Sequence, residues 1–581
     1  MRKVLPERTG APRLSRRRFV QGIAGSAALL SPLHRFARGS AGPERAVLTG
    51  PEFDLTIGEI PVNYTGRNRT ATAVNGQVPG PLLRMRQGDA VTIRVSNRLP
   101  VRSSIHWHGL IVPADMDGVP GVSFAGIEPG ATFVYRFTVN QSGTYWYHSH
   151  SRFQEQTGLY GPIVIEPREG ERHGDAREHV VLLSDWSDAD PEWLYATLKR
   201  QSDYFNYGKR TVGDFFADVG AHGFKETVGE RGMWGQMRMD PSDLVDVGGA
   251  TYTYLMNGVT PAGNWTAPFK PGERIRLRFI NGSSMSFFDV RIPGLKLTVV
   301  AADGQDVEPV TVDELRIGAA EVLDVTVSPS ADQAYTLFAQ SIDRSGYARG
   351  TLAPRMGMVA EVPPLDPRAV LTLDDMGMAH GMADMPGMPQ GMADMPGMAH
   401  HGAPAEFGPT VDMVAMQTAA RLDDPGPGLR DNGRRVLTYA DLHTLGGPID
   451  RRDPAREIEL HLTGHMQRYI WSFNGRKFSE AEPLRFAHGE RLRIVLVNDS
   501  MMTHPIHLHG MWSELAAPDD SFLVRKHTVS VQPAQRLSYL VTADALGRWA
   551  YHCHLLFHME AGMFREVAVE RTGDATSGGH A

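Results

Sequence analysis

The chain has little cysteine and no long apolar segment. The first shortage excludes several kinds of covalent and metal site, and the second excludes a permanent membrane helix. Only one of its 581 residues is cysteine, which excludes an intrachain disulfide, an iron–sulfur cluster and a zinc site built from several thiolates. No stretch approaches the roughly 20 apolar residues that a permanent membrane helix requires. Hydrophobic residues make up 41% and charged residues 22%, which are ordinary shares for a folded chain and exclude a mainly disordered one.

Turn-forming residues and possible metal ligands are abundant instead. The chain has 61 glycines and 39 prolines, more than the usual share of about 12%, which favours many turns and argues against an all-α protein. At roughly 100–200 residues per domain, its length predicts three or four domains. The 23 histidines and 26 methionines are clustered, and both residue types bind copper.

The first 42 residues are interpreted as an export signal. Three arginines, residues 16–18, precede a short and mildly apolar run, residues 22–33, which is typical of the bacterial twin-arginine address. The alternative is a basic disordered tail. Because residues 1–42 contribute +8 to a total of −7, the mature chain carries −15, and such acidity disfavours nucleic-acid binding.

One pattern occurs three times, in residues 74–99, 256–283 and 473–500. Each copy has Asn-Gly, a proline, a Gly-acid pair, a strand with period-two alternation and a final asparagine. A second pattern follows at residues 143 and 547, where a glycine precedes histidines by five and seven positions. The middle unit has no histidine there. Short strands with frequent turns predict three successive β-sandwiches with antiparallel sheets, the middle one without metal ligands.

A biased segment separates the second and third units. Residues 376–401 contain eight methionines and three histidines, and GMADMPGM occurs twice within them. Their glycines and prolines predict a flexible loop in which no periodic face could pack. A plain linker is one interpretation; a loop of soft ligands is favoured because thioethers select Cu(I).

Four histidine-rich clusters lie in the first and third units. They read HWHG from His106, HSH from His148, HPIHLHG from His504 and HCHLLFHMEAGM from His552. On a strand, His-X-His places both rings on one face, because successive side chains alternate. Two such strands from each of two units would point eight imidazoles into one space.

The only cysteine lies inside the last cluster. One Cys, two His and a weak axial Met form the blue-copper ligand set, and Cys553, His558 and Met563 supply three of these from one segment. His504 can supply the second imidazole, and the remaining eight histidines suffice for a three-copper cluster. Zinc is a poor alternative, because three or four ligands would suffice and zinc has no redox chemistry.

All four clusters resemble those of the multicopper oxidases, in the same order and over essentially the whole mature chain. The resemblance implies an all-β fold of three consecutive cupredoxin-like Greek-key sandwiches, with the Met/His-rich loop before the third and a trinuclear centre between the first and third. The expected segments are a signal at 1–42, domain 1 at 43–168, domain 2 at 169–365, the Met/His-rich linker at 366–430, domain 3 at 431–572 and a tail at 573–581.

The resemblance also implies about four copper ions and assigns their ligands. One type 1 ion would be held by Cys553, His504, His558 and Met563. One type 2 ion would be held by His106 and His507. The type 3 pair would be held by His108, His148, His150, His509, His552 and His554. His552 and His554 flank Cys553, which would link the two sites. Asp117 matches an acidic proton-relay position of the family; the alternative is a turn aspartate in Asp-Gly.

Within that family the chain looks like the periplasmic copper-resistance protein A group. The motifs that carry this likeness are the twin-arginine leader, the Met/His repeat, MRMDPSDLVDV (237–247), GHMQRYIWSFNG (464–475) and HGMWSEL (509–515). The likeness implies a periplasmic, exported enzyme that oxidises Cu(I) to Cu(II), reduces dioxygen to water and serves copper tolerance. Two alternatives stay open: a laccase-type phenol oxidase and a copper-sequestering binding protein.

Residues that would bind the substrate Cu(I) are expected near the type 1 site. Met502 is the first candidate, Asp499 the second and Met501 the third, with core packing of both methionines as the alternative. The other candidates are the methionines of the loop: Met376, Met378, Met382, Met385, Met388, Met392, Met395 and Met398. Other periplasmic copper-handling proteins are candidate partners, no membrane span is expected, and a monomer suffices because one chain closes the trinuclear site.

Overall fold

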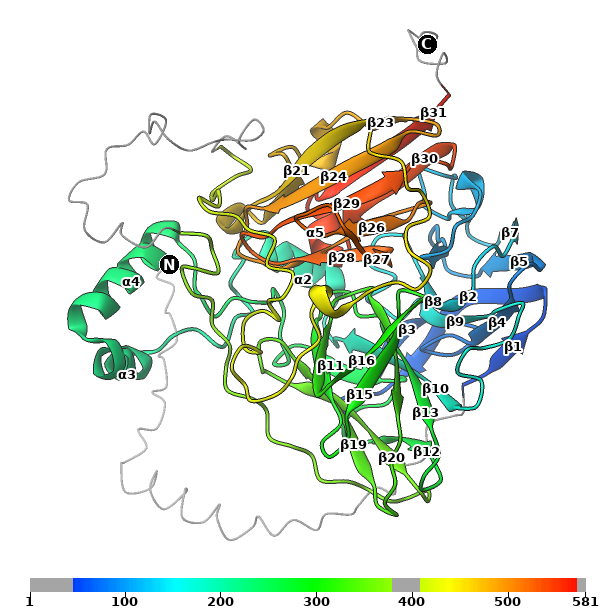
Figure 1. Ribbon diagram of the computed structural model, residues 1–581, viewed down its shortest axis with the longest axis horizontal. Helices are drawn as coiled ribbons and strands as arrows, with labels where there is room; N and C mark the ends of the chain where they lie inside the picture. Colours follow the sequence, from blue (N-terminus) through cyan, green and yellow to red (C-terminus); the bar gives the residue numbers. More distant parts are fainter. Residues whose placement is uncertain (1–44, 379–407, 572–581) are drawn as a thin grey trace, which may run out of the picture. The chain divides into compact units, whose positions relative to one another are not determined.

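The computed structural model describes residues 45–378 and 408–571, and in these ranges the chain forms three β-sandwiches. Figure 1 shows them in blue to cyan, green, and orange to red. The expected export signal lies outside the described residues, as do six loop methionines: Met382, Met385, Met388, Met392, Met395 and Met398. Among the described residues, no helix is long and apolar enough to cross a membrane.

The first sandwich packs a four-stranded sheet against a five-stranded one. The four-stranded sheet has, in spatial order, β3 (Arg69–Val74), β2 (Glu52–Val62), β5 (Ala90–Asn97) and β7 (Thr132–Thr138). The five-stranded sheet has β1 (Val47–Thr49), β4 (Leu82–Arg86), β9 (Tyr160–Glu166), β8 (Gly143–His148) and β6 (His106–His108).

The second sandwich has sheets of six and five strands. The first is β11 (Thr253–Met256), β10 (Arg177–Trp186), β13 (Ile275–Asn281), β18 (Val322–Val327), β15 (Leu297–Ala302) and β16 (Gln305–Val312). The second is β12 (Trp265–Pro268), β20 (Tyr347–Ala353), β19 (Tyr335–Ser341), β14 (Phe288–Arg291) and β17 (Glu314–Ile317).

The third sandwich repeats this order strand for strand. Its six-stranded sheet is β22 (Ile470–Phe473), β21 (Arg456–His465), β24 (Arg491–Asn498), β29 (Arg536–Thr542), β26 (Ser513–Ala516) and β27 (Phe522–Lys526). Its five-stranded sheet is β23 (Leu484–Ala487), β31 (Phe564–Glu570), β30 (Gly547–Cys553), β25 (His504–Leu508) and β28 (Thr528–Val531). The internal repeat in the sequence therefore reflects a repeated topology.

Most neighbouring strands pair antiparallel, as expected, but some pairs in each sandwich are parallel. Each sandwich contains parallel neighbours, namely β1–β4, β2–β5 and β4–β9 in the first, β10–β13 and β12–β20 in the second, and β21–β24 and β23–β31 in the third. The chain crosses between the two sheets before it returns beside an earlier strand, and such long connections permit parallel pairing. The alternation of apolar and polar residues within one strand does not reveal whether the neighbouring strand runs parallel or antiparallel to it.

The first asparagine of each repeat copy forms a tight turn. Asn75, Asn257 and Asn474 have φ values of 50°, 54° and 51°, and each is followed by a glycine that also has positive φ. This is the backbone of a two-residue type I′ hairpin turn, which Asn-Gly favours.

The second asparagine of each copy closes a loop between strands. Asn281 donates from its amide nitrogen to the carbonyls of Ser286 and Ile317, at 2.8 and 3.1 Å, and its oxygen accepts from Ser283 N. Asn97 and Asn498 make the equivalent three bonds in their own sandwiches. All three asparagines are buried, which explains why the pattern ends in this residue each time.

Helices are few and belong mainly to the middle of the chain. Between β10 and β11 lie α2 (Pro191–Leu198), α3 (Val212–His222) and α4 (Phe224–Met237). In Figure 1, α3 and α4 form a hairpin beside the sheets. The short helix α5 (Leu556–Glu560) follows β30. None of these helices was expected from the β-strand repeat.

Two large hydrophobic clusters form the core. One consists only of first-sandwich residues, between Phe53 and Ile165. The other includes buried residues from both the second and the third sandwich, between Phe153 and Val569. The last two sandwiches therefore share continuous apolar packing, and the loops that join them have fixed neighbours.

We expect Asn281→Ala to destabilise the protein by about 2–4 kcal/mol, because two buried carbonyls and one buried N–H lose their partner. The shift in the urea midpoint, read by tryptophan fluorescence, measures this. Asn68→Ala is the control, since its hydrogen bonds lie at an exposed position. If both substitutions shifted the urea midpoint by the same small amount, the buried hydrogen bonds of Asn281 would not stabilise the loop.

Candidate metal centre

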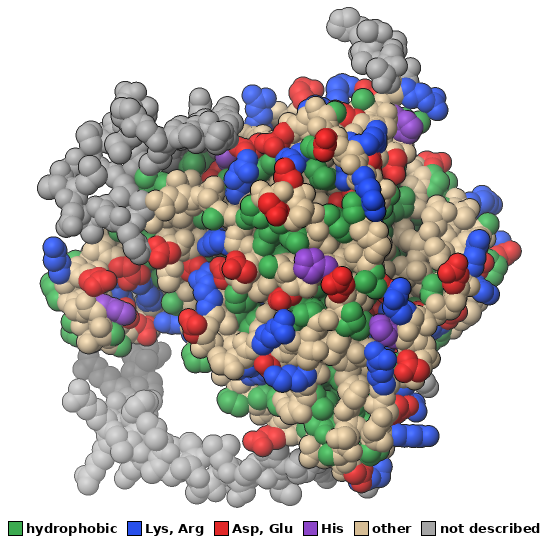
Figure 2. Space-filling view, viewed as in Figure 1, with side chains coloured by type: hydrophobic (Ala, Val, Ile, Leu, Met, Phe, Trp, Pro, Cys, Tyr) green, Lys and Arg blue, Asp and Glu red, His purple; other side chains and the backbone are tan. Residues whose placement is uncertain are grey.

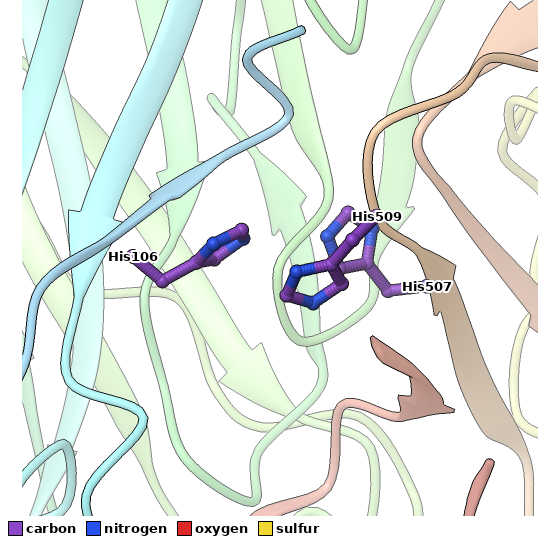
Figure 3. Close-up of side chains that lie close together, drawn as sticks. All are labelled: His106, His507 and His509. Atoms are coloured by element: carbon purple, nitrogen blue, oxygen red, sulfur yellow. The ribbon is translucent and has the colours of Figure 1, made fainter. Parts of the chain in front are cut away.

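Strand pairing brings the eight histidines expected for a trinuclear centre together. In the first sandwich His106 on β6 lies opposite His148 on β8, and in the third His507 on β25 lies opposite His552 on β30. Rings from the two sandwiches then stack: His106 on His509 with centroids 4.0 Å apart, and His108 on His507 at 3.9 Å. Figure 3 shows His106 pointing across a gap toward His507 and His509.

These histidines are almost entirely inaccessible to solvent. Seven of them are at most 3% exposed, and only His150 is partly accessible. On the face in Figure 2, acidic and basic side chains are intermixed and histidine appears at only a few points. The imidazoles therefore face each other rather than water.

Hydrogen bonds fix which nitrogen of each ring carries the proton. His106 Nδ1 donates to the carbonyl of Asp117 at 2.7 Å, and His507 Nδ1 donates to that of His527. His552 Nδ1 donates to the carbonyl of Cys553 at 2.9 Å. In each case Nε2 is left with its lone pair.

The free lone pairs converge without a partner of their own. Nε2 of His106, His150 and His507 and Nδ1 of His108 and His554 are buried and have no hydrogen bond. His509 Nε2 and His552 Nε2 face each other at 3.1 Å, although both Nδ1 atoms already donate elsewhere. Two opposed lone pairs repel unless a cation lies beside them, so these residues fit bound copper ions, which imidazole suits.

Burial also keeps the rings neutral. It lowers the pKa of His552 to about 4, and the carbonyl bond to Cys553 only partly offsets this. Burial and the neighbouring imidazoles lower the pKa well below its usual value in His108, His148, His150, His507, His509 and His554. Neutral imidazole is the form that binds metal.

A second set of ligands surrounds the cysteine. Cys553 Sγ lies 3.5 Å from His504 Nδ1 and 3.8 Å from His558 Nδ1, and the two nitrogens are 3.1 Å apart. Met563 is fully buried, and its carbonyl accepts from Cys553 N at 3.1 Å. Burial raises the pKa of the Cys553 thiol far above its usual value, so a bound metal ion is needed to keep the sulfur as a thiolate.

In the two imidazoles expected at type 1 copper, the nitrogen that points away from Cys553 has its own hydrogen-bond partner. His504 Nε2 bonds with Ser500 Oγ at 2.6 Å, and His558 Nε2 donates to Asp246 Oδ2 at 2.8 Å. Trp471 stacks on the His558 ring with centroids 3.9 Å apart. Both Nδ1 atoms are therefore left free to face the sulfur.

Asp117 lies between two of the predicted ligands. It is fully buried, and its Oδ2 accepts from His509 Nδ1 at 2.9 Å. Its Oδ1 lies 3.3 Å from His106 Nδ1. The carboxylate thus contacts two of the histidines expected at the trinuclear centre, and its residue directly follows the short 3-10 helix Ala114–Met116 as the C-cap.

The Cu(I)-binding candidates beside His504 are buried and engaged in other contacts. Asp499 is 1% exposed; its Oδ2 accepts from His461 Nδ1 at 2.6 Å and its Oδ1 accepts from Ala415 N. Met501 and Met502 are 1% and 2% exposed and belong to the hydrophobic core.

The first loop methionines differ from the expectation as well. Met376 is fully buried in the large hydrophobic cluster, and Met378 packs against it. The expectation that residues 376–401 form a flexible loop with no packed face therefore does not hold at the start of the segment, because the chain there still lies against the core.

Three contacting residues were missed by the sequence reasoning. Asp246 supports His558; Glu155 supports His148, with its Oε2 2.6 Å from Nδ1; and His527 Nδ1 lies 3.1 Å from His108 Nε2. Asp246 lies within the 237–247 motif, and Glu155 lies seven residues after His148. His527 stands outside every histidine cluster, so no local pattern indicates it.

Comparisons with known proteins agree with this geometry. Three family models, all described as multicopper oxidase, match residues 56–170, 177–355 and 451–573. Copper resistance protein A of Pseudomonas syringae pv. tomato is 58% identical, covering 96% of this chain and 99% of the relative. Copper resistance protein A of Escherichia coli is 56% identical with the same coverage.

A solved structure shows the same fold at low identity. Fet3p, described as a multicopper oxidase that functions in iron import, superimposes with a TM-score of 0.63 at 20% identity, covering 92% of this chain and 93% of that one.

We expect the copper-free protein to lose stability as the pH falls from about 6.5 toward 4. The pKa of His552 is near 4 when folded but about 6.5 when unfolded. Unfolding therefore takes up a proton between these two pKa values, so the free energy of unfolding falls as the pH is lowered through this range. Above about pH 6.5 this loss is absent. Each such histidine adds a slope of up to about 1.4 kcal/mol per pH unit.

Denaturant titrations of the copper-free protein at pH 7.5, 6 and 5 measure this slope. His552→Gln should reduce it by about one histidine's share, whereas His222→Gln, which removes an exposed side chain, should leave it unchanged. A stability that does not vary over this range would contradict the neutral, buried state of the imidazoles.

Proposed function

Since the chain belongs to the multicopper oxidase family, and within it to the copper resistance protein A group, we propose that it is a periplasmic cuprous oxidase serving copper tolerance. It would couple the one-electron oxidation of Cu(I) to Cu(II) to the four-electron reduction of dioxygen to water. The family makes it an oxidoreductase with copper cofactors that uses oxygen. The reductant, the export route and the periplasmic location are the proposed part.

One observation supports the coupling most strongly. Cys553 belongs to the type 1 set, and its neighbours His552 and His554 belong to the trinuclear set, so one strand end joins the two. Bound copper would supply the redox chemistry, accepting single electrons at one site and delivering four to dioxygen at the other. The chain provides the connection: one peptide unit joins the cysteine to each neighbouring histidine, which is a short covalent path for an electron.

The chain also supplies the surroundings for a reaction that consumes protons. Asp117 contacts His509 and His106, so its carboxylate is placed to hold a proton beside the trinuclear histidines. His150 lines an open cleft of about 520 Å³ together with Arg152, Gln154 and Glu192. This cleft supports access of a molecule as small as dioxygen to an otherwise buried site.

Cu(I) as the reductant is supported by an acidic path to the type 1 site. Asp246 Oδ2 holds His558, while Asp246 Oδ1 and Asp243 Oδ1 are buried without any hydrogen bond. Burial first, and then Asp246, Asp203 and Asp240, raise the pKa of Asp243 well above its usual value. Asp203 is about 40% exposed and pairs with Lys209, so the cluster reaches the surface. Beyond that pair, an arriving cation would relieve the repulsion between Asp243 and Asp246.

The two alternatives make different predictions. A phenol oxidase would need no acidic path, and a binding protein would need no connection through Cys553. Steady-state oxygen uptake with Cu(I) and with a phenol distinguishes the first alternative. Copper counting distinguishes the second, because about four ions per chain mean an oxidase and many more mean storage.

We expect Asp243→Asn to raise the KM for Cu(I) about tenfold, equivalent to ~1.4 kcal/mol, because the path loses a buried carboxyl group that an arriving cation could ionise and bind. Phenol oxidation and the blue absorption should stay close to the parent's, since in the described part of the chain no hydrogen bond joins Asp243 to His504, Cys553 or His558. Cys553→Ser is the reference that loses both activities. Equal loss on Cu(I) and phenol in Asp243→Asn would remove the support for this copper path.

A further inference from the structure

The middle sandwich supplies none of the expected ligands, yet one of its turns lies close to both halves of the trinuclear site. Strands β15 and β16 are joined by the two residues Asp303 and Gly304, with φ values of 46° and 77°. Asp-Gly is a preferred sequence for such a type I′ hairpin. Asp303 is fully buried, so this turn points into the protein rather than to solvent.

Asp303 binds the third sandwich at the junction of β27 and β28. Its Oδ2 accepts from the backbone N–H groups of His527 and Thr528, at 3.1 and 3.2 Å, and lies 3.0 Å from Lys526 Nζ. Its Oδ1 accepts from Val322 N at 2.9 Å within its own sandwich. Both carboxylate oxygens are therefore occupied by donors, and one of them holds three consecutive residues.

Those residues bear directly on two expected copper ligands. The carbonyl of His527 accepts the Nδ1 proton of His507, which leaves His507 Nε2 for the metal. Thr528 Oγ1 and His527 Nδ1 each lie 3.1 Å from His108 Nε2, which leaves His108 Nδ1 for the metal. The peptide held by Asp303 thus determines the usable nitrogen in one ligand from each sandwich.

The same turn also touches the first sandwich. A Cβ on Gly304 would lie 2.2 Å from the ring of Tyr145, and one on Gly143 would lie 2.2 Å from the carbonyl oxygen of Gly304. Gly143 begins β8, the strand that ends at His148. The backbones approach so closely that the turn fits between the two sandwiches that carry the ligands.

The buried ion pair between Asp303 and Lys526 is poorly explained by a gain in folding stability alone. Lys526 is 1% exposed and is shared between Asp303 and Glu321, at 3.0 and 3.2 Å. A buried ion pair costs desolvation energy that apolar residues of the same size avoid, so its benefit is better sought in fixing one geometry.

We propose that the β15–β16 turn is a positioning device for the trinuclear copper site, with Asp303 as its positioning residue. It holds residues 526–528 so that His507 and His108 present Nε2 and Nδ1, respectively, to the metal. The middle sandwich, which has no ligands, thereby aligns the two that do. The inference rests on the family's copper site and is independent of whether Cu(I) or a phenol is the reductant.

Asp303→Asn tests this with the smallest change in shape. Both oxygens of Asp303 accept from N–H groups, so the amide NH₂ of asparagine must face a donor on one side. The matched control is Asp289→Asn. Asp289 is equally buried in the same sandwich, but its oxygens accept only from Arg316 and Arg344.

The readouts are copper per chain, the type 2 electron paramagnetic resonance signal, the blue absorption and the thermal midpoint of the copper-free protein. We expect Asp303→Asn to weaken copper binding at the trinuclear site about 10–100-fold, as loss of a supporting partner does at other metal sites. The type 2 signal should change while the blue absorption persists. Asp289→Asn should lower the thermal midpoint but leave both copper signals as in the parent.

Two results would overturn the proposal: a parent-like type 2 signal in Asp303→Asn, or the same spectral change in Asp289→Asn. If Asp303→Asn gives no folded protein, Asp303→Glu takes its place. Glutamate keeps the charge and both acceptors but displaces residues 526–528 by one methylene, so an altered type 2 signal with an intact blue absorption is expected. A parent-like signal in that variant would equally reject the positioning role.

Discussion

The lone pairs of buried imidazoles impose the central constraint on this structure. His509 and His552 bring two such lone pairs within 3.1 Å of each other, and other ring nitrogens around them have no protein partner. In a polypeptide alone this arrangement is costly, because each buried polar atom without a partner loses about 1–3 kcal/mol. Bound metal ions convert the same atoms into ligands, so the surroundings must keep the rings neutral, correctly protonated and close together.

The fold meets this constraint with backbone groups as well as with side chains. Carbonyls of Asp117, His527 and Cys553 accept the Nδ1 protons of three rings and so direct their Nε2 atoms inward. A backbone carbonyl does not ionise and moves only with the backbone. It therefore keeps the proton of the neutral imidazole on Nδ1 at any pH at which the protein is folded. The carboxylates of Asp117, Glu155 and Asp246 support the rings of His509, His148 and His558, and the hydroxyls of Ser500 and Thr528 contact those of His504 and His108. The positions of strands and loops are therefore as important for the site as the histidines themselves.

Much of the site could be predicted because it is encoded in short spacings. His106 and His108 lie two apart on a strand, and Cys553, His558 and Met563 lie within eleven residues, so strand alternation and ligand chemistry suffice. Other contacts come from residues distant in sequence. Asp303 reaches His527 across 224 positions, and Asp246 reaches His558 across 312. Met501 and Met502 illustrate a different limit, because a thioether that packs in a core and one that binds copper have the same sequence signature.

The second and third sandwiches also show two ways of burying polar side chains on equivalent strands. Strand β14 of the middle sandwich occupies the place that β25 occupies in the third. Where β25 carries His504 and His507, β14 carries Asp289 and Arg291, whose partners are Arg316 and Glu314. Ion pairs satisfy these groups within one sandwich and need no metal, so the middle unit retains its strand order without ligands. The middle unit contacts its neighbours through loops instead. At the β15–β16 turn, the buried carboxylate of Asp303 binds residues 526–528 and so orders ligands that the other two units supply.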